Sequence, residues 1–156
     1  MDTALNKVRE FHRQIGAAVE ESPTLLACQA ESASEIAAAI RNLLSNCRDR
    51  ADDGSNLVSR LCLALEELAE WVEAHAAGDL VAAADAWGDR LYVLLGDAVA
   101  AGLPADAIFD EVHRSNISKA VSRPGSLGKG TKGSEFRKPR LEQILCSPQA
   151  HDADRS

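Results

Sequence analysis

The sequence predicts an all-α protein built as a helical bundle, with a four-helix core and additional helices. Apolar residues recur at spacings of three and four along several segments, which is typical of amphipathic helices. Aromatic residues make up only 4% of the chain, and no stretch shows the alternation of β-branched residues that marks strands. A chain of 156 residues suits a single domain. We expect this domain to span residues 1–146, followed by a disordered tail over residues 147–156.

Two helices are expected in the first third of the chain. The first covers residues 4–19 and ends at the Glu-Glu-Ser-Pro segment, residues 20–23, because proline disfavours a helical conformation in the residue before it. The second begins at a capping box formed by Ser32 and Glu35. Its inward-facing residues are expected to be Ile36, Ala37, Ile40, Leu43, Leu44 and Cys47. The Asp-Asp-Gly-Ser segment, residues 52–55, then interrupts the chain.

The next two helices are expected to pack antiparallel through a short turn, residues 74–79. The first of the pair has Ser55 or Asn56 as its N-cap. One face of it carries three carboxylates within about 100° of one another, those of Glu66, Glu67 and Glu70. Its apolar face comprises Leu61, Ala64, Leu65, Leu68, Trp71 and Val72. The second helix, residues 80–103, is apolar nearly all the way round, so we expect it to be buried.

The last third of the chain is expected to hold less helix. Gly102 and Pro104 separate the buried helix from the next one, which runs to about residue 118. Its inward-facing residues are expected to be Ile108, Phe109 and Val112. Residues 121–135 contain four glycines and one proline, a composition that predicts a loop. A short helix over residues 139–146 precedes the tail.

Carboxylates on the antiparallel pair suggest a metal site. Asp85 and Asp89 lie four residues apart on the helix expected to be buried, and a buried carboxylate must be paired or hold a cation. If the acids of the two helices face each other, they repel unless a divalent cation lies among them. An all-oxygen cluster favours Mg²⁺ or Mn²⁺ over zinc. The plainer alternative for the acidic stripe is a solvated helix surface.

Charge is distributed unevenly along the chain. The net charge is −7, yet residues 114–140 contain eight lysines and arginines against one glutamate. This basic segment fits a polyanionic ligand bridged to carboxylates by cations, and the alternative is a solvated tail. A nucleic-acid partner is disfavoured by the acidic remainder and by the lack of aromatic residues among the basic ones.

The cysteines and the amino-terminal segment predict a cytoplasmic location. Cys28, Cys47, Cys62 and Cys146 form no C-x-x-C pair, so we expect reduced thiols. The first twelve residues carry charges where a signal peptide needs an apolar run. No membrane span is expected, because charged residues interrupt the only long apolar segment.

Several motifs, in their order and spacing, carry a resemblance to a known family. L-x-x-E-E-L-A-E (residues 63–70) is followed by D-R-L-Y-V (89–93), V-H-R-S-N-I-S-K (112–119), K-G-x-x-F (132–136), an approximate P-P-x-L (138–141) and E-Q-I-L (142–145). The chain thereby resembles the MazG-like all-α nucleoside triphosphate pyrophosphohydrolases. The opening E-F-H-R-Q-I-G-A, residues 10–17, is similar to the start of single-domain members that act on dUTP. Residues 22–55 fall outside the resemblance and are expected to add an extra helix.

The resemblance implies roles for particular residues. The implied metal ligands are Glu67, Glu70, Asp89 and, as a substitute, Asp85. A substitute is needed because the family's second acidic motif reads E-x-x-D, whereas Ala86 stands three residues before Asp89 here. Glu66 is expected to orient or deprotonate the attacking water. The implied substrate-binding residues are Asn116, Lys119, His113, Lys129 and Lys132. For Asn116 and Lys119 the alternative is an ordinary polar helix end.

The implied activity is hydrolysis between the α- and β-phosphates of a nucleoside triphosphate, with Mg²⁺ or Mn²⁺ as cofactor. We expect a role in cleaning the nucleotide pool, dUTP among the substrates, and a homodimer, as in the family. Two alternatives stay open. One is an enzyme of the same fold that acts on another nucleotide such as phosphoribosyl-ATP, and the other is a non-catalytic interaction protein whose metal site has decayed.

Overall fold

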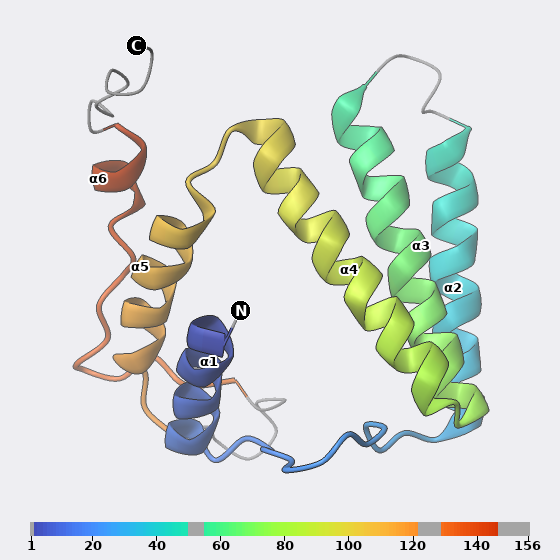
Figure 1. Cartoon of the computed structure of the whole chain (residues 1–156), viewed down its shortest axis with the longest axis horizontal. Helices are drawn as coiled ribbons and strands as arrows, with labels where there is room; N and C mark the ends of the chain where they lie inside the picture. The colour runs from blue at the N-terminus through green and yellow to red at the C-terminus, as the bar shows by residue number, and fades with distance from the viewer. Residues whose placement is uncertain (1, 50–54, 122–128, 147–156) are drawn as a thin grey trace. The chain divides into compact units, whose positions relative to one another are not determined.

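The structure is a computed structural model that describes residues 2–49, 55–121 and 129–146 (Figure 1). These residues form six helices, and the described ranges contain no strand beyond an isolated bridge between Ala120 and Thr131. The helices are α1 (Asp2–Ile15), α2 (Ala30–Arg48), α3 (Asn56–Ala77), α4 (Leu80–Ala101), α5 (Ala105–Ile117) and α6 (Leu141–Leu145). The all-α class is therefore confirmed.

The chain divides into two compact units, which are described separately. The central unit is Glu21–Ala101, and the terminal unit combines Met1–Glu20 with Gly102–Ser156. A single domain over residues 1–146 stays a prediction. The expected tail, residues 147–156, lies outside the described residues, as do most of the interruption at 52–55 and residues 122–128 of the expected loop.

In the central unit, α2 and α4 both pack along α3 (Figure 1). Its hydrophobic core lies between α2 and α3, where Leu44, Cys62 and Leu65 are buried together. Ile40, Cys47 and Val58 pack against that cluster. The helix expected outside the resemblance thus supplies half of the core of this unit.

The N-cap of α3 is one of the two predicted residues, whereas the helix continues to Ala77, into the turn expected over residues 74–79. Ser55 is the N-cap, and its side chain accepts a hydrogen bond of 3.3 Å from the backbone N–H of Val58. At the other end Gly78 adopts the left-handed conformation, with φ of 72°. The Asp79 carboxylate then accepts from the N–H groups of Val81 and Ala82, both at 3.0 Å, and so begins α4. The antiparallel pairing of α3 and α4 follows from this tight turn.

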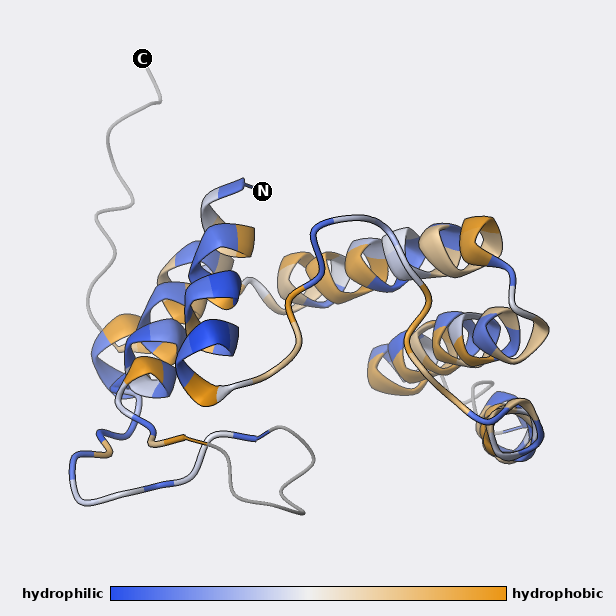
Figure 2. Cartoon of the chain, turned by 90° about the horizontal axis from the view of Figure 1, so that it is seen from below, coloured by the Kyte–Doolittle hydropathy of each residue, from blue (hydrophilic) through white to orange (hydrophobic). Residues whose placement is uncertain are grey.

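The prediction that α4 is buried is wrong. Only Ala83 and Ala86 are buried on it, whereas Tyr92 and Val99 are 81% and 83% exposed. Hydrophobic residues recur along the ribbon of α4 (Figure 2), and many of the large ones are exposed. They are Leu80, Val81, Trp87, Tyr92, Leu94, Leu95 and Val99. The physical reason is that α4 packs along one neighbour, α3, which covers a single face of a helix that is apolar on several.

The predicted start of α2 is also wrong. The helix begins at Ala30, and its N-cap Gln29 makes no side-chain capping hydrogen bond. Ser32 therefore lies inside the helix rather than at a capping box. Ile36 and Leu43, expected to face inward, are 55% and 50% exposed because only one face of α2 meets α3.

In the terminal unit, α1 and α6 pack against α5. α1 ends at Ile15, four residues earlier than predicted, because Gly16 takes a left-handed φ of 72°. The side-chain amide of Gln14 donates to the carbonyls of Ile117 and Lys119 at 2.8 and 2.9 Å, which ties α1 to the end of α5. α5 matches its prediction closely, although Val112 is 36% exposed.

The thiols and the helix lengths bear on the expected compartment. All four cysteines are free, as predicted. Among the described helices, none is by itself long and apolar enough to cross a membrane, and only α4 and α5 counted together would meet that test of length and composition. The cytoplasmic location stays a prediction.

Candidate functional site

An acidic groove of about 350 Å³ lies between α3 and α4 near their connecting turn. Its lining includes four carboxylates, those of Glu70, Glu73, Asp79 and Asp85. Small side chains, among them Ala74, Ala82 and Ala86, form its floor and leave the groove open. The antiparallel packing thus brings Glu70 of α3 and Asp85 of α4 to one depression, whereas Glu66, Glu67 and Asp89 do not line it.

Glu67 lies about one turn before Glu70 on α3, and its carboxylate is partly buried. Its Oε2 atom is buried and has no hydrogen-bond partner in the described part of the chain. Burial raises the pKa of this carboxyl above its usual value, and the charges of Glu70, Asp89, Glu66 and Asp85 raise it further. All five predicted acids therefore interact electrostatically at this place, and a cation there would relieve their repulsion.

Arginines of α2 compensate part of this negative charge. Arg41 forms a bidentate pair with Glu73, through Nε at 2.8 Å and Nη2 at 2.7 Å, and the pKa of Glu73 is lowered by that hydrogen bonding. The same Nη2 lies 3.7 Å from Oε1 of Glu70. Arg48 donates to Glu66 at 2.9 Å. Two of the predicted site residues, Glu66 and Glu70, thus have a cationic partner on the neighbouring helix.

Arg41 and Arg48 are not among the residues predicted from the sequence. A signal for them does exist, because the two arginines are seven residues apart on α2 and their partners Glu66 and Glu73 are seven apart on α3. Residues seven apart share a helix face, and antiparallel helices pair such positions in reverse order. That signal can be used only once α2 and α3 are known to be neighbours.

The acids on α4 are not buried, contrary to the prediction. Asp85 and Asp89 are both exposed, whereas Ala86, which stands where the family has a glutamate, is 5% exposed. Within residues 2–49, 55–121 and 129–146, no three histidine, cysteine, aspartate or glutamate side chains converge closely enough to hold one metal ion. Glu66, Glu70 and Glu73 approach arginines of α2, and Asp85 and Asp89 are exposed. The buried Oε2 of Glu67 has neither kind of surrounding.

The predicted substrate-binding residues all lie in the terminal unit. His113 is 3.7 Å from the Glu10 carboxylate, measured from Nε2 to Oε2. Lys119 and Lys132 each place their ammonium group over a phenylalanine ring, Phe11 at 5.9 Å and Phe136 at 5.1 Å from the ring centroid. Asn116 is half-buried and its carbonyl accepts from the N–H of Lys119 at 2.9 Å, while Lys129 is exposed. These contacts leave their proposed role untested.

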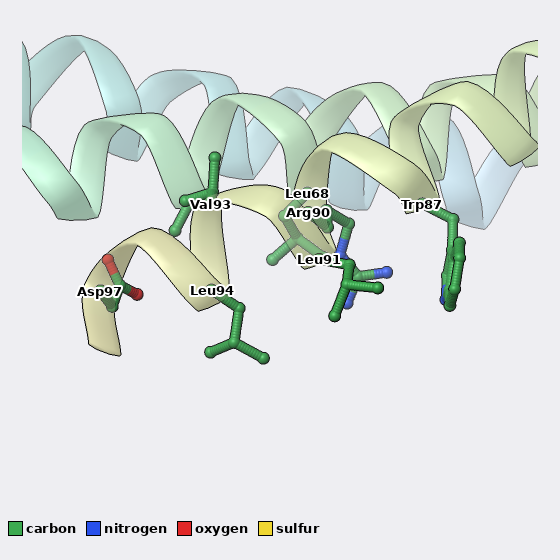
Figure 3. A pocket seen from close by; sticks show the side chains of 8 residues that line it. Leu68, Trp87, Arg90, Leu91, Val93, Leu94 and Asp97 are labelled. Atoms are coloured by element: carbon green, nitrogen blue, oxygen red, sulfur yellow. The ribbon is translucent and has the colours of Figure 1, made fainter. Parts of the chain in front are cut away.

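A second depression of about 350 Å³ lies along the other side of α4 and is mostly apolar. Trp87, Leu91 and Leu94 project from α4 away from α3, whereas Val93 points towards it (Figure 3). The Arg90 guanidinium lies over the ring of Trp71, 4.4 Å from its centroid, and links the two helices at this depression. The lining of this depression is mostly apolar, whereas half of the residues that line the acidic groove are carboxylates.

With the acidic groove placed on α3 and α4, comparison with protein families shows what this segment is similar to. Residues 45–116 match the family model of phosphoribosyl-ATP pyrophosphohydrolase. The match covers slightly less than half of the chain, including all of α3 and α4 and therefore every predicted carboxylate. Comparison with curated proteins and with solved structures gives no match.

The phosphoribosyl-ATP pyrophosphohydrolase match confirms the resemblance to the MazG-like all-α superfamily. It implies a pyrophosphohydrolase, an enzyme that hydrolyses an acid anhydride. His113 and Asn116 lie inside the matched segment, whereas Lys119, Lys129, Lys132 and nearly all of α2 lie outside it.

Proposed function

We propose that the protein is a metal-dependent pyrophosphohydrolase that cleaves the bond between the α- and β-phosphates of a nucleoside triphosphate. The products are a nucleoside monophosphate and pyrophosphate. The observation that carries this proposal is the family match over residues 45–116, because it includes both helices whose acids meet at the groove.

Glu67 and the acids around it suit a divalent cation. The buried Oε2 of Glu67 lacks a hydrogen-bond partner in the described residues, and four neighbouring carboxylates add to its cost of ionisation. A set of donors made only of carboxylate oxygens favours Mg²⁺ or Mn²⁺. We propose that Glu67, Glu70 and Asp89 hold the cation, with Asp85 as the fourth ligand in place of the acid absent at Ala86.

The residues of the chain then have separate tasks. The bound cation would neutralise triphosphate charge and acidify a water molecule. Glu70 must leave Arg41 to contribute to cation binding, since its Oε1 lies 3.7 Å from the guanidinium. Glu66, which accepts a hydrogen bond from Arg48, would orient the attacking water or accept its proton.

Two candidate substrates follow from the sequence and from the family match. We propose a nucleoside triphosphate, with dUTP as the first to test, because residues 10–17 are similar to the start of dUTP-hydrolysing members. Phosphoribosyl-ATP is the second candidate, because the matching family is the one that hydrolyses it. The proposed contacts of Asn116, Lys119, His113, Lys129 and Lys132 with phosphate or sugar oxygens apply to either substrate.

A non-catalytic interaction protein is the alternative from another class. The pairing of Arg41 and Arg48 with acids of α3, together with the buried Ala86, favours a stripe of acids kept for helix packing. In that account the groove binds no cation.

One assay separates these accounts. Pyrophosphate release is measured from dUTP, the other nucleoside triphosphates and phosphoribosyl-ATP, each with Mg²⁺ or Mn²⁺. We expect turnover of at least one substrate, and a loss of at least a hundredfold in Glu70→Gln. Absence of turnover with every substrate, in a folded protein that also binds no Mn²⁺, would support the non-catalytic bundle.

A further inference from the structure

Arg60 joins α3 to α4 at the end of the helix pair that lies away from the connecting turn. Its Nε donates to Oδ1 of Asp97 at 2.7 Å, and its Nη2 donates to the backbone carbonyl of Val93. The guanidinium lies against Gly96, where an added Cβ would be only 2.6 Å from Nη2. A glycine at this position therefore leaves the room that the arginine occupies.

The two-residue turn at Gly78 and Asp79 and the contact of Arg90 with Trp71 also constrain the pairing of α3 and α4, but at the far end of the pair the packing specifies the register weakly. The two buried side chains of α4, Ala83 and Ala86, are both methyl groups. Small side chains let helices approach closely but interdigitate weakly, so a shift along the axis costs little packing energy. A charged group with two directed hydrogen bonds specifies one register, because any shift would leave its partners without their donor.

The register decides which acids face each other. Glu67 lies seven residues after Arg60, and Asp89 lies eight residues before Asp97. In an antiparallel pair these nearly equal offsets bring Glu67 and Asp89 to the same level whenever Arg60 and Asp97 are paired. A slip of one turn would separate them by about 5.4 Å along the axis. Bonds between Mg²⁺ and oxygen are only about 2.1 Å long, so such a slip would break a shared cation site.

We propose that Arg60 is a positioning residue, which fixes the register of α4 on α3 and so holds Asp89 at the level of Glu67 for cation binding. The role in cation binding rests on the proposed function, whereas the role in register does not. Arg60 touches neither the cation nor the substrate in this account, and it acts through the backbone of α4.

The register is tested by a distance that needs no metal. Spin labels are attached at Leu57→Cys on α3 and Ala100→Cys on α4, both exposed positions, in a chain whose four native cysteines have been replaced. Labelled protein is diluted with unlabelled protein so that only distances within one chain are measured. We expect one narrow distance distribution with Arg60 present, and one broadened or shifted by about 5 Å in Arg60→Met. An unchanged distribution in Arg60→Met would overturn the inference.

The consequence for the site is tested by calorimetric titration with Mn²⁺ alone. Arg60→Met is expected to weaken Mn²⁺ binding at least tenfold, and Arg60→Lys less, because lysine keeps the charge but offers one point of contact. Gly96→Ala keeps every charge and displaces only the end of a flexible side chain, so it should weaken Mn²⁺ binding at nearly unchanged melting temperature. The matched control is Lys7→Met, which removes one cation from an interhelical ion pair with Asp110 in the terminal unit.

The outcomes separate this inference from the proposed function. Unchanged Mn²⁺ affinity in both Arg60→Met and Gly96→Ala would overturn the positioning role. Absence of Mn²⁺ binding by the unaltered protein, together with absence of turnover, would overturn the proposed function and with it the cation half of the inference. The distance measurement still decides the register half.

Discussion

At the scale of single residues, Glu67 is where stability and the proposed function oppose each other. Its carboxyl has a raised pKa because it is partly buried and surrounded by four other acids, and one of its oxygens has no partner in the described chain. Such a group costs folding free energy in its charged form. A bound cation would offset this cost by neutralising the charge of the Glu67 carboxylate.

Glu67→Gln is therefore expected to stabilise the metal-free protein at pH 7 while removing Mn²⁺ binding. A carboxyl with a raised folded-state pKa binds more protons in the folded than in the unfolded state, so stability falls as the pH rises through the interval above 4.5. Glutamine does not ionise, so the variant avoids this loss of stability. Its melting temperature should exceed that of the unaltered protein by about 2 °C or more at pH 7 but by little at pH 4.

Thermal unfolding of both proteins between pH 4 and 8, in the presence of a chelator, measures the effect. A lower melting temperature for Glu67→Gln at pH 7 would contradict the account of Glu67.

Among the helices, α2 has two roles. It packs against α3 to form the core, and it supplies the arginine side chains that pair with the glutamates of α3. Arg41 and Arg48 reach three glutamates of α3, and one of these, Glu70, is a proposed metal ligand. Arg41 would compete with a bound cation for that carboxylate, because a lone pair cannot serve both at full strength. The helix that packs beside the proposed site would therefore also limit its affinity for the cation.

Arg41→Met is accordingly expected to tighten Mn²⁺ binding, by about threefold to tenfold, while lowering the melting temperature by a few degrees because an interhelical ion pair is lost. Calorimetric titration and thermal unfolding measure the two effects, with Lys7→Met as the control for loss of one cation from an interhelical pair. Weaker Mn²⁺ binding in Arg41→Met would mean that this arginine supports the site instead of competing for it.

Glu111 on α5 fixes the segment that leads to α6. Its Oε1 accepts from Arg114 Nη2 and from the backbone N–H of Arg140, both at 2.5 Å. The hydrogen bonds from Arg114 and from Arg140 lower the pKa of this carboxyl to about 2. A lowered folded-state pKa means that its contribution to stability is complete above pH 4.5 and is lost as the pH falls towards 2.

We expect Glu111→Gln to lower the melting temperature at pH 7 and to lower it much less near pH 2, where the native carboxyl becomes protonated. Limited proteolysis should also cut the region of Arg137 and Lys138 faster in the variant at pH 7. An equal difference in melting temperature at the two pH values would rule out this role.

Some elements could be predicted from the sequence and others could not, for physical reasons. Helix periods and the Ser55 cap are local features, so the start of α3 and both ends of α5 lie within about two residues of their predicted positions. By contrast, α1 ends four residues early and α3 continues into the expected turn. The cap of α2 was misplaced because Ser32 and Glu35 also fit a helix interior, and backbone pairing began at Ala30 instead. The arginine partners of the acids and the contact of Arg60 with Gly96 depend on which helices are neighbours, and this information is absent from any local pattern.

For the molecule as a whole, the exposed apolar residues of α4 form a candidate surface for binding a partner. An apolar helix can be buried by its own chain or can keep a face for another copy, and composition alone does not distinguish these cases. The exposed tyrosine, tryptophan, leucines and valines of α4 are the kind of residues that form the core of protein interfaces. We propose that this face pairs with the same face of a second chain, giving the homodimer expected from the resemblance.

The double variant Tyr92→Glu with Val99→Glu is expected to convert the dimer to a monomer, because two carboxylates on each chain would meet at the interface. Sedimentation equilibrium measures the mass, and Leu57→Glu is the control at an equally exposed position on α3. A monomeric unaltered protein, or a dimer that survives the double substitution, would contradict the proposed interface.

The most direct test of the central claim is a crystal structure of the protein grown with Mn²⁺ and a non-hydrolysable dUTP analogue, with the ion located by its anomalous scattering. We expect an ion bound about 2 Å from carboxylate oxygens of Glu67, Glu70 and Asp89, with Glu70 released from Arg41 and the triphosphate attached to the ion. Crystals that contain no anomalous peak beside Glu67, Glu70 and Asp89, with Glu70 still beside Arg41, would contradict the claim that these acids hold a catalytic cation.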